Sequence, residues 1–176
     1  MRALLLLLLV AAPRERLFAP WQVHPNCSLV TIPPPSLQDI AIARPVVLAF
    51  AHQIGAPYTV LYLQTAAAKP YHPTCVRLVQ RSAMHFTRYT YRAQRVDSSQ
   101  LVGSTWQPLL AQLGKGYHAT LCESVSTAPT TSILLVKQGT KLTYSLQFTD
   151  YYAPDFTAAD RTRLAPALAL ARRLLN

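Results

Sequence analysis

The sequence predicts an α+β fold, namely a mainly antiparallel sheet of about five to six strands with an N-terminal and a C-terminal helix packed on one face. Two observations favour this fold. Segments rich in β-branched and aromatic residues follow one another through the middle of the chain, and segments with apolar residues at helical spacing flank them. Consecutive strands with helices at the ends are typical of an antiparallel sheet covered by helices.

The first helix is expected after Ser36. Residues 36–39 have the form of a capping box, in which side chains satisfy the free amides at a helix start. Apolar residues then recur at helical spacing as far as Ile54, and Gly55 follows as a stop. Pro45 lies inside this pattern, so we expect it to kink or divide the helix.

The sheet is expected from six segments that have strand-like composition. They are residues 58–64, 75–82, 85–92, 117–124, 133–137 and 141–149, and the last two form a hairpin around residues 138–140. In residues 141–149, apolar and polar side chains alternate, which predicts one buried face and one wet face.

Two further helices are expected. Residues 106–113 form a short one that ends before Gly114. The C-terminal helix follows a second capping box at residues 157–160 and carries leucines and alanine on one face. Pro166 interrupts its pattern and favours a start nearer Leu164 than Thr157.

The N-terminal part of the chain differs in composition. Residues 1–19 begin with an arginine, an apolar run and small residues, the layout of a secretory signal peptide, although Arg14 and Arg16 leave an uncleaved membrane anchor open. The apolar run is too short for a permanent transmembrane span. Residues 20–35 are a proline-rich linker or tail, with an edge strand at 28–32, and residues 36–176 form a single domain. We therefore expect export to the periplasm, cell surface or medium.

Positive charge is concentrated in one part of the chain. The net charge is +10, and no acidic residue lies between Asp39 and Asp97. Arginine beside aromatic residues on a strand can bind polyanions such as nucleic acid, anionic lipid or acidic polysaccharide. The alternative is a solvated basic face that keeps the protein soluble. The candidate polyanion-binding residues are Arg77, Arg81, Phe86, Arg88, Tyr89, Tyr91, Arg92 and Arg95.

The three cysteines fit an exported protein. Cys75 and Cys122 both lie in predicted strands, and a disulfide between them would close a long loop. Cys27 is left over, which indicates an intermolecular contact or an alternative pairing.

Each cysteine also has a histidine three or four residues before it, at His24, His72 and His118. Imidazole and thiolate groups are zinc ligands, but the long separation between the pairs and an oxidising compartment favour the disulfide over a metal site.

The chain lacks the sequence motifs of hydrolase, phosphate-binding and dinucleotide-binding sites. We assign no catalytic residue, metal or cofactor. The favoured interpretation is a small exported, non-catalytic binding or structural domain with a basic and aromatic face. One alternative is a polyanion-binding protein that uses residues 81–95. Another is a hydrolase or a thiol- or metal-dependent enzyme that uses His72, Cys75, His118 and Cys122.

Overall fold

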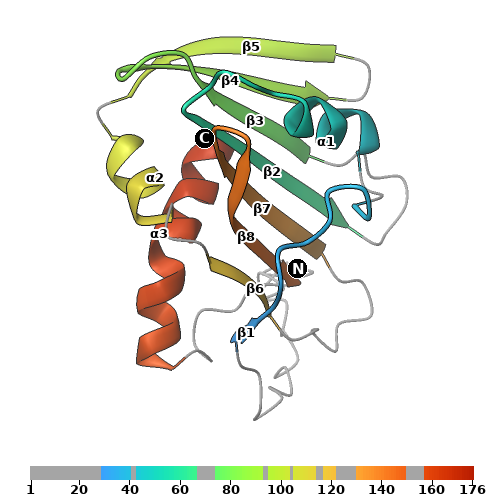
Figure 1. The fold of residues 1–176 in the computed structure, drawn as a ribbon, viewed down its shortest axis with the longest axis vertical. Coiled ribbons are helices and arrows are strands. Elements are labelled where there is room, and N and C mark those ends of the chain that lie inside the picture. The colour runs from blue at the N-terminus through green and yellow to red at the C-terminus, as the bar shows by residue number, and fades with distance from the viewer. Residues whose placement is uncertain are drawn as a thin grey trace, which may run out of the picture.

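The computed structural model describes residues 29–40, 43–66, 74–92, 95–103, 105–113, 117–121, 130–149 and 157–176. Its strands are β1 (Leu29–Thr31), β2 (Tyr58–Ala66), β3 (Thr74–Gln80), β4 (His85–Arg92), β5 (Arg95–Val102), β6 (Tyr117–Leu121), β7 (Thr130–Gln138) and β8 (Lys141–Thr149). Its helices are α1 (Arg44–Ala51), α2 (Gln107–Leu113) and α3 (Ala158–Leu175). The predicted α+β class is confirmed (Figure 1).

The sheet has eight strands in the order β1-β6-β8-β7-β2-β3-β4-β5, which is more than the five to six expected. All neighbours pair antiparallel except β6 and β8, which run parallel, so the sheet is mixed. The strand missing from the expectation is β5. Its sequence includes the polar run Asp97-Ser98-Ser99-Gln100, and most of its side chains are exposed at the sheet edge. A strand that buries little carries a weak hydrophobic pattern.

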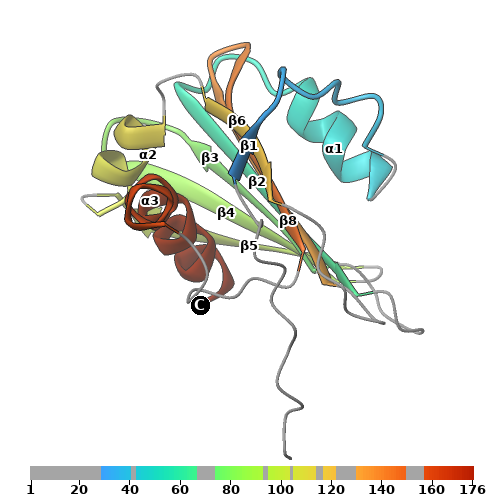
Figure 2. The same ribbon diagram turned by 90° about the horizontal axis from the view of Figure 1, so that it is seen from below.

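The helices lie on both faces of the sheet, so the expectation that they share one face is wrong (Figure 2). On one face, Val47 and Phe50 of α1 pack with Leu61 of β2. On the other face, α2 and α3 pack with Val60 and neighbouring residues. Adjacent residues of β2 are therefore both buried, because a strand covered on both sides is apolar on both sides.

Helix α1 begins at Arg44, later than the sequence predicts. Pro45 lies in the first turn of the helix, where backbone N–H groups make no hydrogen bond within the helix. The missing N–H of proline therefore costs nothing there, and Pro45 starts the helix and does not kink it. The expected capping box forms a turn: the Gln38 amide donates to Ser36 Oγ at 3.3 Å and the Asp39 amide to the Ser36 carbonyl at 3.1 Å.

The C-terminal end of α1 is held by a lysine that the sequence analysis did not single out. Lys137 of β7 is 2% exposed. Its Nζ donates to the carbonyl oxygens of Phe50, Ala51 and Gln53 at 3.1, 2.7 and 3.1 Å. The last carbonyls of a helix have no partners within the helix, and a cation stabilises that end. Lys137 therefore fixes α1 on the sheet.

Helix α3 begins directly after Thr157, as the capping pattern predicts and contrary to the later start that Pro166 favoured. The Asp160 amide donates to Thr157 Oγ1 at 3.1 Å. Pro166 lies inside the helix. The buried face of α3 compensates for the hydrogen bond that Pro166 cannot make, because Leu164, Ala167 and Leu170 lie in the core.

The sheet also includes part of the predicted tail. β1 pairs with β6 at the sheet edge, which confirms the expected edge strand and places residues 29–31 within the folded unit. The predicted signal peptide or anchor, residues 1–19, lies outside the described residues. Among the helices that the structure describes, none is long and apolar enough to cross a membrane.

Candidate binding pocket

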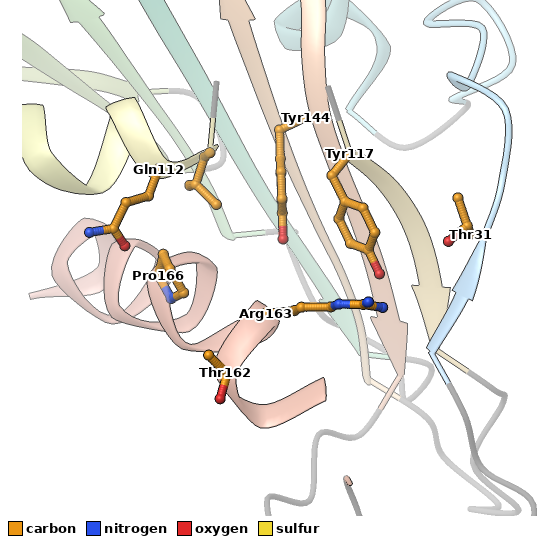
Figure 3. Close-up of a pocket in the computed structure, with 8 residues that line it drawn as sticks. Thr31, Gln112, Tyr117, Tyr144, Thr162, Arg163 and Pro166 are labelled. Atoms are coloured by element: carbon orange, nitrogen blue, oxygen red, sulfur yellow. The ribbon is translucent and has the colours of Figure 1, made fainter. Parts of the chain in front are cut away.

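A pocket of about 540 Å³ lies on the α2 and α3 face of the sheet, between these helices and strands β1, β6 and β8 at one end of the sheet (Figure 3). We call it the tyrosine pocket. Pockets of a few hundred cubic ångströms are typical of small-molecule sites. It is lined by Thr31, Gln112, Leu113, Tyr117, Tyr144, Thr162, Arg163 and Pro166.

Parallel pairing of β6 and β8 brings two tyrosines together in this pocket. Tyr117 is the register partner of Tyr144, so both side chains lie on the same face of the sheet. Their ring centroids are 5.9 Å apart and the rings are tilted by 41°. In Figure 3 both hydroxyls point in the same direction, toward α3.

Both tyrosine hydroxyls lack a hydrogen-bond partner among the described residues, and both oxygens are shielded from solvent. Tyr144 is only 2% exposed. A buried hydroxyl without a partner is costly, and native structures contain few of them. Burial, with a smaller contribution from Tyr117, raises the pKa of Tyr144. Tyr144 is therefore protonated at neutral pH and can donate a hydrogen bond.

Arg163 supplies the pocket with a positive charge. It projects from the N-terminal half of α3, and in the view of Figure 3 its side chain extends below the Tyr144 hydroxyl toward the Tyr117 hydroxyl. The residue is exposed, and no described residue makes a hydrogen bond or ion pair with it. The site thus combines two hydroxyl donors, one cation and an apolar wall.

The sequence patterns do not predict this pocket. The alternation in residues 141–149 predicts that Tyr144 is buried, and it is, but the predicted wet face is wrong because Thr143 and Ser145 are buried as well. The register of β8 shifts opposite Val136 and Lys137, so Leu142 packs on the α1 side of the sheet and Tyr144 on the other side. A tyrosine among the apolar residues of a strand brings a hydroxyl into the core, and that hydroxyl needs a hydrogen-bond partner. This is the local sequence feature that indicates a polar site near Tyr144. Nothing local in the sequence linked Tyr144 to Tyr117 or Arg163.

The predicted polyanion-binding residues do not form one surface, because successive side chains of a strand point to opposite faces. Arg77, Arg81, Tyr89 and Tyr91 lie on the α1 face, and Phe86, Arg88, Arg92 and Arg95 lie on the opposite face. Phe86 is fully buried in the core and cannot contact a polyanion at the surface, so its inclusion among the binding residues is wrong.

On the α1 face the arginines are bound to their neighbours. Arg77 lies 4.7 Å from the centroid of the Tyr89 ring and donates to the Ala49 carbonyl at 3.1 Å. Arg81 donates to the Tyr89 hydroxyl at 2.6 Å and to Thr87 Oγ1 at 3.3 Å. These contacts connect α1 with β3 and β4, which is a structural role.

On the opposite face, Arg92 and Arg95 are exposed and directly opposite each other on β4 and β5. Like charges in this position destabilise a strand pair unless an anion lies between them. Nearby, Arg88 is half-buried and its Nε has no partner among the described residues. The ends of β4 and β5 therefore present arginine N–H donors that can bind an anion.

The cysteine and histidine candidates are only partly within the described residues. Cys75 is buried beneath α1, and burial raises the pKa of its thiol to about 11. Because the thiolate is the nucleophilic form, Cys75 is a weak nucleophile at neutral pH. Cys27, His72 and Cys122 lie outside the described residues, as does His24, so the disulfide between Cys75 and Cys122 remains a prediction.

His118 lies far from any predicted partner within the described structure. It is 8% exposed, its Nδ1 is 2.8 Å from Ser145 Oγ, and burial lowers its pKa. Ser145 is also buried, at 3% exposed, so a substrate could not reach this serine and histidine without local opening. The part of the chain that the structure describes contains no cluster of potential metal ligands.

Comparison of the chain with protein-family models, with curated proteins and with solved structures finds no match. A functional inference for this chain therefore starts from the geometry of its own residues. Within the described residues, the tyrosine pocket combines buried polar groups with free volume.

Proposed function

We propose that this protein is a non-catalytic binding domain that holds a small molecule in the tyrosine pocket. The observation that carries this proposal is the Tyr144 hydroxyl, which is buried, has no partner among the described residues and lies at the wall of a pocket of about 540 Å³. A bound molecule would supply the missing acceptor and recover the cost of burying that hydroxyl.

The lining residues favour binding over chemistry. Those that the structure describes include no carboxylate, imidazole or thiol, which are the usual acid, base and nucleophilic groups. The raised pKa of Tyr144 makes it a poor base at neutral pH. Export, predicted from residues 1–19, would place this binding function outside the cytoplasm.

The test is binding of a fluorescent amphipathic dye, anilinonaphthalene sulfonate, by the folded protein. Thr162→Trp places a large side chain at an exposed helix position that lines the pocket, and Ala165→Trp places the same side chain at an exposed position on α3 that does not. We expect saturable dye binding that Thr162→Trp abolishes and Ala165→Trp preserves. Equal binding by both variants would contradict the proposal.

Polyanion binding is the second candidate function, and the exposed pair Arg92 and Arg95 favours it. Two arginines held side by side would bind phosphate or sulfate groups with little rearrangement. In this alternative the recognition corner is the end of β4 and β5, and the α1-face residues Arg77 and Arg81 contribute structure only.

A further inference from the structure

Resting on the proposed binding function, we infer that the ligand of the tyrosine pocket is an amphipathic monocarboxylate. Its carboxylate is bound by Arg163 and the hydroxyls of Tyr117 and Tyr144. Its apolar part lies against Leu113 and Pro166.

The polar half of the pocket supplies donors that need an acceptor. The hydroxyls of Tyr117 and Tyr144 have no acceptor among the described residues, and the guanidinium of Arg163 carries further N–H donors. A carboxylate has two acceptor oxygens and binds a guanidinium through parallel hydrogen bonds. It therefore satisfies the cation and both hydroxyls with one group.

The charge of the lining limits the charge of the ligand. Arg163 is the one ionised side chain among the lining residues that the structure describes. A single negative charge is neutralised by it, whereas a dianion would bring an unpaired charge into a partly buried site, which is costly. The match is to one carboxylate rather than to a phosphate or a dicarboxylate.

The remaining wall of the pocket calls for an apolar group. Leu113 is 2% exposed, and Pro166 and the rings of the two tyrosines add further apolar surface. Burial of a hydrocarbon group against these residues would contribute to affinity in proportion to its area.

The side chain of Arg163 can adjust its position to the ligand. It is exposed, and in the view of Figure 3 it extends along the hydroxyl end of the pocket. A long arginine side chain can move toward an anion without a change in the backbone.

The experiment is displacement of anilinonaphthalene sulfonate by decanoate, with decanol as the neutral probe of the same chain length. We expect decanoate to displace the dye at roughly tenfold or more lower concentration than decanol does. Arg163→Gln should weaken decanoate roughly ten- to a hundredfold and leave decanol unchanged. Arg163→Lys should restore part of the loss, and Arg161→Gln, which removes a neighbouring exposed charge, should have little effect.

The outcomes separate this inference from the proposed function. If the dye binds in the pocket but decanol competes as well as decanoate, or Arg163→Gln leaves decanoate binding unchanged, the carboxylate assignment is overturned and the binding function stands. If the dye does not bind, or Thr162→Trp does not block it, both are overturned. Circular dichroism of each variant confirms that it is folded.

Discussion

Tyr117 lies beside Tyr144, with ring centroids 5.9 Å apart, and neither hydroxyl has a hydrogen-bond partner among the described residues. Another buried tyrosine of the same core, Tyr62, has its hydroxyl 3.3 Å from Ser132 Oγ. Among the described residues, the fold thus satisfies one buried tyrosine hydroxyl and leaves another without a partner at a pocket. The proposed binding function rests on this contrast.

The contrast predicts opposite stability effects for two matched substitutions. Tyr144→Phe removes an unpaired buried hydroxyl, so the free energy of unfolding should stay the same or rise by about 1 kcal/mol. Tyr62→Phe removes a paired hydroxyl and leaves Ser132 without that contact, so the free energy of unfolding should fall by about 1 kcal/mol. Urea denaturation measures both. A clear loss of stability in Tyr144→Phe would show that its hydroxyl is satisfied in the native protein.

Lys137 should be essential for holding α1. Lys137→Met keeps much of the side-chain volume but removes the ammonium donor from three carbonyl oxygens at the end of α1, of which, among the described residues, only that of Phe50 keeps another donor, the Gln53 amide. We expect the free energy of unfolding to fall by about 2–4 kcal/mol. Lys141→Met, at an exposed position of the same hairpin, should change it by less than about 0.5 kcal/mol. Comparable effects of the two variants would contradict the capping role.

Gly103 should not tolerate a side chain because of Phe86. A Cβ at position 103 would clash with the Phe86 ring. Gly103→Ala should therefore lower the free energy of unfolding by about 1–3 kcal/mol. In the double variant with Phe86→Leu, the two effects should be less than additive, because the smaller side chain makes room. Strict additivity in a thermal denaturation cycle would show that the two positions are not in contact.

His118 should make stability depend on pH. Burial lowers its pKa below the ordinary 6.5, so between the lowered value and about 6.5 the unfolded state binds more protons than the native state. The free energy of unfolding therefore rises with pH across this window and falls on acidification. His118→Asn should reduce that slope, whereas Ser145→Ala should retain it, since burial is the cause. An unchanged slope in His118→Asn would disprove this assignment.

Polyanion binding can be tested at the corner that the structure identifies. Removing both arginines in Arg92→Ala/Arg95→Ala should weaken heparin binding and reduce the slope of log affinity against log salt by roughly two. Arg161→Ala/Arg172→Ala removes the same charge from exposed positions of α3 and serves as the control. Equal losses in the two double variants would indicate a non-specific effect of net charge, and no salt-dependent binding would exclude this function.

Much of the fold follows from local patterns. The composition of residues 141–149 predicts β8 and that of residues 85–92 predicts β4, both with the observed ends. The capping box at Thr157 marks the observed start of α3, whereas the later start that Pro166 favoured is wrong. These features depend on residues close together in the chain, so composition and spacing reveal them. By contrast, β5 was missed because its polar residues at the sheet edge bury too little to give a pattern.

The candidate site depends on contacts between distant residues. Tyr117 and Tyr144 meet because β6 pairs with β8 in parallel, and Arg163 joins them because α3 crosses the same face of the sheet. Hairpin signals identify only strands that are neighbours in the chain, and β6 is separated from β8 by β7. No local signal encodes such a pairing.

The sequence alone determines that the chain forms an α+β domain, where most of its helices and strands lie, and where its positive charge is concentrated. The tertiary structure decides which strands lie side by side and which faces of the sheet the helices cover. It buries Phe86 and assembles the tyrosine pocket. The physical reason is that secondary structure follows from short-range periodicity, whereas a binding site needs strand order and register, which depend on packing of the whole core.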